Sequence, residues 1–365
     1  MTHLPIMRPR LPAAEAIQPY LARIDAARIY SNLGPLVAGL ESRLAEHFGA
    51  PGPSVATVAN GTLGLTLALS GLGAKPGTLC VMPAWTFVAS PQAATFAGLV
   101  PYFVDVDPET CALEPAAMDR ILATAPGEVG AVMPVMPFGR PIDVAGWDAF
   151  RARRNLPVVI DAAAGFDTLT PSYAPAVVSL HATKALGIGE GGFLLSLDHS
   201  LVRSVHRRTN FGFDGTRDAA VPGFNAKLSE YHAAVGHAAL DEWPAARLEW
   251  LAVARSYRDR LRDVPTAQFP PGFGESWISS VCTVELPEAH VVQFEERLHQ
   301  ADVATRRWWS QGAHAHQSTK HLPRTALPVT ERLARLTVAV PFHRDLELSD
   351  VDRVVDCLRL CGGET

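Results

Sequence analysis

Short apolar runs alternate with helical patterns between residues 55 and 197. The runs are four to eight residues long, rich in valine and leucine, and continuous in their apolarity, so each is expected to be buried on both faces. In order they read VATV, TLCVMP, VPYFVDV, VGAVMPVM, LPVVIDAA, PAVVSL and GGFLLSL. Helices are predicted between them at 61–72, 87–97, 114–123 and 144–154. This alternation predicts an α/β domain with a mostly parallel sheet.

The pattern changes after Asn225. A long helical segment is predicted near 229–262, and Pro244 is expected to break or kink it. Strand, helix, strand and helix then follow as ISSVCTVEL, EAHVVQFEERLHQA, LTVAVPF and LSDVDRVVDCLRLC, the last with Ser349 as its expected N-cap. The N-terminal 45 residues are predicted to carry one helix over 36–48, preceded by the loop YSNLGPL.

Length and composition limit the class of protein. The chain has 365 residues, 48% of them hydrophobic and 19% charged, which indicates a soluble globular protein with a large core. We predict a large domain over 1–240, including the N-terminal segment, and a smaller α+β domain over 241–365. The net charge of −5 and the lack of a basic block argue against nucleic-acid binding. No apolar run reaches the ~18 residues that span a bilayer, and no signal h-region is present, so a cytoplasmic protein is expected.

Candidate ligand groups stand at the ends of predicted strands, where open α/β sheets bind their ligands. Asn60-Gly61-Thr62 opens a helix, and the free N–H groups of a helix start suit a phosphate; an ordinary strand-to-helix turn fits the same residues. Asp161 ends a buried strand, where a carboxylate needs a cationic or hydrogen-bonding partner. It is either a local helix cap or a partner for a protonated ring nitrogen.

Lys184 is one of only four lysines among the 32 basic residues. A surface position is the simplest interpretation, but its neighbours are small or apolar, and Ser179 lies at the end of the same strand. A desolvated lysine amine deprotonates and forms a Schiff base, which a guanidinium cannot do. A lysine, an aspartate for a pyridinium nitrogen and a phosphate-binding turn together indicate pyridoxal phosphate (PLP). Trp85 and Phe87 are either core aromatics or candidates to stack on its ring.

Seven segments, in this order, resemble the DegT/StrS-type PLP-dependent sugar aminotransferases over nearly the whole chain: SNLGPLVAGLESRLAEHFGA, NGTLGLTLAL, MPAWTFVASPQA, VDVDPETCALEP, VIDAAAGFDT, SLHATKALGIGEGG and FNAKLSEYHAAVG. The resemblance implies the PLP fold type I. That fold has a three-layer αβα large domain with a mostly parallel seven-stranded sheet and a smaller C-terminal α+β domain.

The resemblance also implies roles for single residues. Lys184 would bond covalently to the cofactor and move protons, while Asp161 would hold the pyridine nitrogen protonated. Phe87 matches the ring-stacking position better than Trp85 does. Ala164 stands where the family commonly has Gln or His beside the phenolic oxygen, so tuning of the ring there differs. This chain has Lys184 where the family's dehydratases have His, which favours transamination.

Further contacts are implied for the phosphate and the substrate. The backbone of Gly61 and Thr62 and the hydroxyl of Ser179 would hold the phosphate, and Asn225 would reach the neighbouring subunit's cofactor in a homodimer with shared active sites. Sugar-nucleotide contacts are expected from RRTNFGFDG, from Tyr30, Asn32 and Gly34, and from the basic, aromatic stretch RRWWSQGAHAHQ, with the two histidines of its Ala313-His314-Ala315-His316 segment.

The implied reaction is a ping-pong transfer of an amino group from L-glutamate, through pyridoxamine phosphate, to a nucleotide-linked ketosugar, aminated at C3 or C4. The product would serve surface-polysaccharide or secondary-metabolite sugars. Ala164 leaves open a PLP enzyme with another outcome, such as dehydration or action on a non-sugar ketone. A non-catalytic PLP-binding regulatory protein is a further alternative. GIGEGG precedes a strand, which disfavours a dinucleotide-binding dehydrogenase, and the histidines lack the partners of a metal site, so none is expected.

Overall fold

Seven strands form the sheet on which the site is built. The computed structural model describes residues 3–361 and shows these strands in the order β3-β2-β4 in one hydrogen-bonded section and β5-β6-β7-β1 in the other. Parallel bridges from Val132 to Val158 and from Val135 to Asp161 join the two sections. Only β7 runs antiparallel to its neighbours, so the predicted mostly parallel sheet is confirmed. The strands are β1 Val55–Val58, β2 Leu79–Pro83, β3 Val100–Val104, β4 Val129–Val132, β5 Ile160–Asp161, β6 Ala176–Ser179 and β7 Gly192–Leu195.

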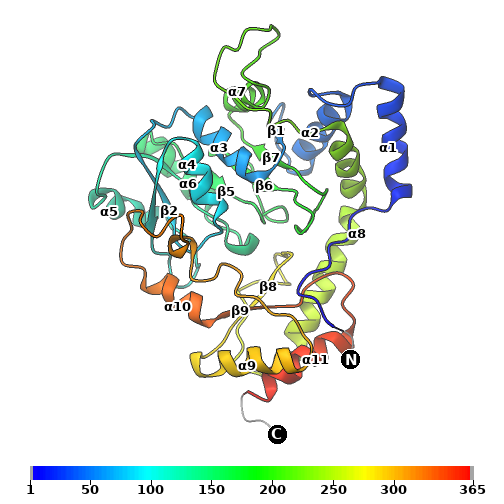
Figure 1. Ribbon diagram of the computed structural model, residues 1–365, viewed down its shortest axis with the longest axis vertical. Helices are drawn as coiled ribbons and strands as arrows, with labels where there is room; N and C mark the ends of the chain where they lie inside the picture. Colours follow the sequence, from blue (N-terminus) through cyan, green and yellow to red (C-terminus); the bar gives the residue numbers. More distant parts are fainter. Residues whose placement is uncertain (1–2, 362–365) are drawn as a thin grey trace.

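Helices cover both faces of this sheet, which makes the three layers visible in Figure 1. Successive residues of a strand point to opposite faces; Val177 joins the hydrophobic cluster with Leu65 and Val205, whereas Val178 joins the cluster with Trp147. The first cluster includes side chains of α3 and α7, and the second those of α2, α6 and α8. The helices of this domain are α2 Pro35–His47, α3 Gly61–Gly71, α4 Ala89–Phe96, α5 Met118–Ala123, α6 Val144–Arg154 and α7 His199–Thr209.

The long helix α8, Glu230–Arg260, connects the large and small domains. It continues through Pro244, so the predicted break there is wrong. Proline removes one backbone hydrogen bond, but α8 packs along α1, α2 and α11 and buries Leu240, Trp243 and Trp250 around that position. The boundary predicted at 240/241 falls inside this helix and remains a prediction.

The small domain pairs β8 Cys282–Glu285 with β9 Thr337–Val340 in antiparallel register. Its helices are α9 Glu288–Gln300, α10 Pro328–Leu336 and α11 Leu348–Arg359. Ser349 is not the N-cap of α11. Glu347 holds that position in a capping box with Asp350, because a glutamate two residues earlier provides the reciprocal pair that a lone serine lacks.

The N-terminal segment returns to the small domain. Leu4 pairs with Val303, and Phe342 donates its backbone N–H to the Ile6 carbonyl at 3.0 Å. Helix α1, Ala14–Ala27, then packs against α8; it was not predicted, because Ile24 is its only buried residue and no apolar stripe marks it. Among residues 3–361, no helix has the length and apolar character needed to cross a membrane.

Candidate active site

A cavity of about 440 Å³ opens at the ends of β5 and β6 and at the start of α3. We call it the catalytic cavity. The structure brings together in its lining most of the residues predicted from the sequence, namely Gly61, Thr62, Phe87, Asp161, Ala164, Ser179 and Lys184. Strand ends that are far apart in sequence thus meet at one edge of the sheet, as the open α/β architecture requires.

Asp161 is held by a short hydrogen-bond chain at the floor of this cavity. Its side chain is buried, with 5% of the residue exposed. The Ser90 hydroxyl donates to Oδ2 at 2.6 Å, and the Ala163 N–H donates to Oδ1 at 3.1 Å. Since the Ser90 proton is used on Asp161, the Thr86 hydroxyl at 2.7 Å must donate to Ser90. Burial raises the pKa of Asp161, while these bonds and the Lys184 charge oppose that rise.

Lys184 faces the same cavity from the segment after β6. Burial lowers the pKa of its amine, and the charge of Asp161 acts in the opposite direction. The chain is turned back here by bonds from Ala182 N–H to the Gly189 carbonyl at 2.7 Å and from Leu180 N–H to the Gly191 carbonyl at 3.0 Å. Gly189 has a φ of +98°, which favours glycine. The glycines therefore form the turn into β7.

The start of α3 offers two free N–H groups. Asn60 caps the helix by accepting from Leu63 N–H at 2.9 Å, and its carbonyl accepts from Gly64 N–H at 3.1 Å. Gly61 and Thr62 are left without an intrahelical partner, as the first residues of a helix always are. A Cβ on Gly61 would lie 3.3 Å from the Ser179 Cβ. The helix end and the β6 end thus form a narrow cradle that suits an anion.

The two candidate aromatics lie in different places. Phe87 lines the catalytic cavity and is 56% exposed, whereas Trp85 is buried and contacts Trp309 and Phe138 in T-shaped geometry at 5.3 Å and 6.3 Å. Trp85 does not line this cavity. The structure therefore favours Phe87 as the residue available to a planar ligand, and Trp85 as a core aromatic.

The small domain supplies a wall that was predicted only in outline. From the stretch RRWWSQGAHAHQ, the structure places Arg306, Trp308 and Trp309 in the lining. The Arg306 guanidinium lies 5.1 Å from the centre of the Trp308 ring, and within residues 3–361 no carboxylate pairs with it. Ser90 and Thr86 were missed altogether, because a serine inside a predicted helix carries no signal that it points at an aspartate 71 positions away.

The other predicted contacts lie outside the lining of the catalytic cavity. His314 packs edge-on against Phe103, and His316 accepts the Thr319 N–H at its carbonyl. The remaining ones lie near α8: Tyr30 stacks on Tyr231, Asn32 has a φ of +65°, Gly34 caps α2, and Asn225 accepts a hydrogen bond from Lys227 at 2.7 Å. Their ligand roles stay predictions.

Known proteins of similar sequence and structure share this architecture. Residues 13–359 match the DegT/DnrJ/EryC1/StrS aminotransferase family. A dTDP-4-amino-4,6-dideoxy-D-glucose transaminase of Shigella dysenteriae is 30% identical over 71% of this chain and 70% of its own. A Bacillus cereus protein classed as a PLP-dependent aminotransferase superposes with a TM-score of 0.91 at 29% identity, covering 98% and 100% of the two chains. The structure of DesI with its TDP-sugar product gives 0.87 at 30% identity, covering 100% and 94%.

Proposed function

The chain belongs to the DegT/DnrJ/EryC1/StrS aminotransferase family, and from that premise we propose that it moves an amino group from L-glutamate to a nucleotide-linked keto-deoxysugar. The observation that carries the proposal is the cavity in which the Lys184 amine, the buried Asp161 carboxylate and the free N–H groups of α3 converge. Relatives that act on, or are bound to, dTDP- and TDP-linked sugars support the substrate class.

The residues present fit pyridoxal phosphate. Gly61, Thr62 and Ser179 form an uncharged cradle for its phosphate, where an added Cβ would reduce the space. Asp161 would bind its ring N–H, and Phe87 would cover one ring face. When bound, the cofactor supplies an aldehyde carbon for covalent attachment and a ring that accepts an electron pair.

The protein's own part in the reaction is proton transfer and orientation. A lowered pKa makes Lys184 a base near neutral pH, so it can take the proton from the α-carbon of the amino donor and return it one bond away. Asp161 stays ionised beside a ring N–H, because that charge offsets its desolvation. Ser90 and Thr86 are positioning residues, since they fix the carboxylate without touching substrate.

Arg306 supplies the positive charge at the mouth of the cavity. Both proposed substrates are anions, one a dicarboxylate and the other a nucleotide diphosphate ester, and a guanidinium binds either group through paired donors. Since Arg306 has no carboxylate partner within residues 3–361, its donors are available. We assign it to the α-carboxylate of the amino donor.

A homodimer would complete the site. Tyr30, Tyr231, Phe211 and Phe224 are large aromatic residues with roughly half of their surface exposed, and exposed apolar patches of this kind mark interaction surfaces. Asn225 lies beside Phe224 and outside the chain's own catalytic cavity. This supports its predicted contact with the partner's cofactor.

Lys184→Ala tests the proposal directly. We expect it to abolish the visible absorption of the covalently attached cofactor and both half-reactions, with L-glutamate and with a TDP-linked ketosugar. Lys320→Ala, at an exposed lysine, is the matched control and should behave as the wild type. Turnover by Lys184→Ala at a rate near that of the wild type would refute the mechanism.

A further inference from the structure

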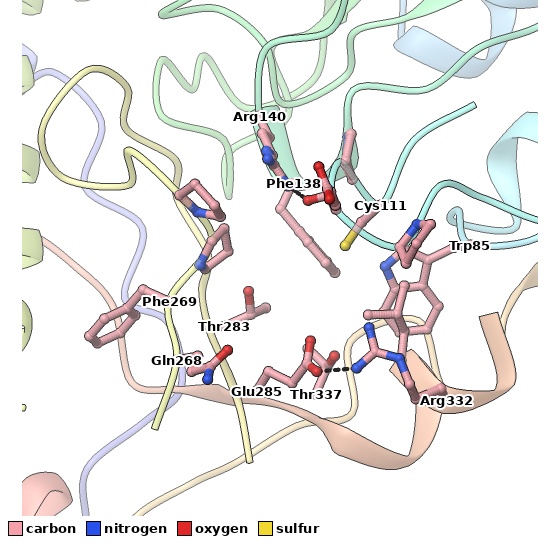
Figure 2. A pocket seen from close by; sticks show the side chains of 16 residues that line it. Trp85, Cys111, Phe138, Arg140, Gln268, Phe269, Thr283, Glu285, Arg332 and Thr337 are labelled. Atoms are coloured by element: carbon pink, nitrogen blue, oxygen red, sulfur yellow. Dashed lines mark hydrogen bonds and ion pairs between the residues drawn. The ribbon is translucent and has the colours of Figure 1, made fainter. Parts of the chain in front are cut away.

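A second cavity, of about 350 Å³, lies between the large and small domains. Figure 2 shows it bounded by Cys111, Phe138 and Arg140 from the large domain, and by residues of β8, α10 and the segment before β8 from the small domain. Phe138 is the one residue that lines both cavities, and it stacks on Trp309 at 3.9 Å between ring centres. No residue proposed above for binding or catalysis lines this second cavity, which lies within the size range of small-molecule sites.

Several polar side chains of this cavity have hydrogen-bonding capacity that the protein does not use. Thr283 is 4% exposed, yet within the described chain its hydroxyl has no hydrogen-bond partner. The same holds for the side chains of Gln268 and Thr337 in that part of the chain. All three line one wall (Figure 2). Because a buried hydroxyl without a partner costs free energy, such a group set beside a cavity indicates a ligand that supplies the missing bonds.

The charges around the cavity are balanced. Glu285 forms an ion pair with Arg332 (Figure 2). Arg140 donates to the Glu109 carbonyl at 2.7 Å, and the Glu109 carboxylate also belongs to the lining. Two guanidinium groups and two carboxylates leave no net field to select an ion, but they offer fixed donors and fixed acceptors together.

Apolar surfaces complete the lining. Phe269, Pro270 and Pro271 lie on the small-domain side, and Pro108 and Pro137 on the large-domain side. A ligand that fits this cavity therefore carries several groups that both donate and accept hydrogen bonds, has apolar C–H faces, and has no charge. We propose that the second cavity binds an uncharged polyhydroxylated ring of monosaccharide size, separately from the reaction at Lys184.

Binding of methyl α-D-glucopyranoside to the cofactor-loaded enzyme tests this proposal. We expect saturable binding by isothermal titration calorimetry. Thr283→Val, which keeps the shape and removes the hydroxyl, should weaken binding about five-fold, the loss typical of one buried hydrogen bond. Gln268→Ala should weaken it by a similar factor. Thr325→Val, at an exposed threonine with a local bond to Ala326, is the matched control and should leave the affinity unchanged.

Three results would overturn the assignment: no saturable binding, equal affinity in wild type, Thr283→Val and Gln268→Ala, or tighter binding of methyl glucuronide, whose carboxylate would show that charge selects the ligand. Melting temperature and the L-glutamate half-reaction, measured on the same variants, report folding and catalysis. Both should be unchanged, because neither residue lines the catalytic cavity. The inference does not depend on the proposed acceptor, so its failure and the failure of the aminotransferase proposal are distinguishable.

Discussion

The two walls of the catalytic cavity are built in different ways. The large-domain wall consists of strand ends, with Asp161 and Ser179 fixed by the hydrogen-bond ladder of the sheet and Lys184 by the turn that follows it. The small-domain wall is a loop, held by two backbone bonds between Arg306 and Ala339 at 3.2 Å and 2.9 Å. Groups that change protonation state lie on the first wall, and a permanent cation with two indoles lies on the second. We infer that the sheet wall performs the chemistry and the loop wall recognises substrate.

Asp161→Asn should give the largest effect on this division. An amide cannot hold a ring nitrogen protonated, so we expect kcat for the L-glutamate half-reaction to fall by at least about 100-fold. KM should change little. Stopped-flow absorbance of the bound cofactor measures both, with the exposed Asp119→Asn as control. A loss confined to KM would remove the distinction between the walls.

Ser90→Ala should have a smaller effect on the same wall. Removing a hydrogen bond to a charged group costs about 1.5 kcal/mol or more, which corresponds to roughly ten-fold in kcat. Since the Ser90 bond lowers the pKa of Asp161, its loss raises that pKa, and the ionised form then requires a higher pH. The acid limb of the pH–rate profile should move to higher pH. A lower kcat with an unmoved profile would indicate that Ser90 only packs.

Arg306→Gln should have the smallest effect and a different signature. We expect KM for L-glutamate to rise about ten-fold with kcat nearly unchanged, because the lost guanidinium bound the carboxylate in both ground and transition states. Arg306→Lys should recover part of the affinity, since it keeps the charge but not the paired donors. A change in KM for the ketosugar alone would assign Arg306 to the diphosphate.

The same contrast explains what the sequence could predict. Strands announce themselves as apolar runs, and a polar residue that ends such a run, such as Asp161 or Lys184, must lie at the sheet edge. The loop wall has no such periodicity, so Trp309 and Arg306 appeared only as part of a basic, aromatic stretch. Ser90 depends on the tertiary fold alone. Pro244 misled because local propensity was overridden by packing along α8.

Helix α8 also determines how the molecule can be divided. A helix of 31 residues is about 46 Å long, and it runs through the position predicted as the domain boundary, while Leu4 and Ile6 tie the beginning of the chain to the small domain. The small lobe is thus assembled from both ends of the polypeptide around one rigid spine. A fragment of residues 1–240 would keep a third of that spine and lose the partners of its first strand, so the lobes have to be studied as one mechanical unit.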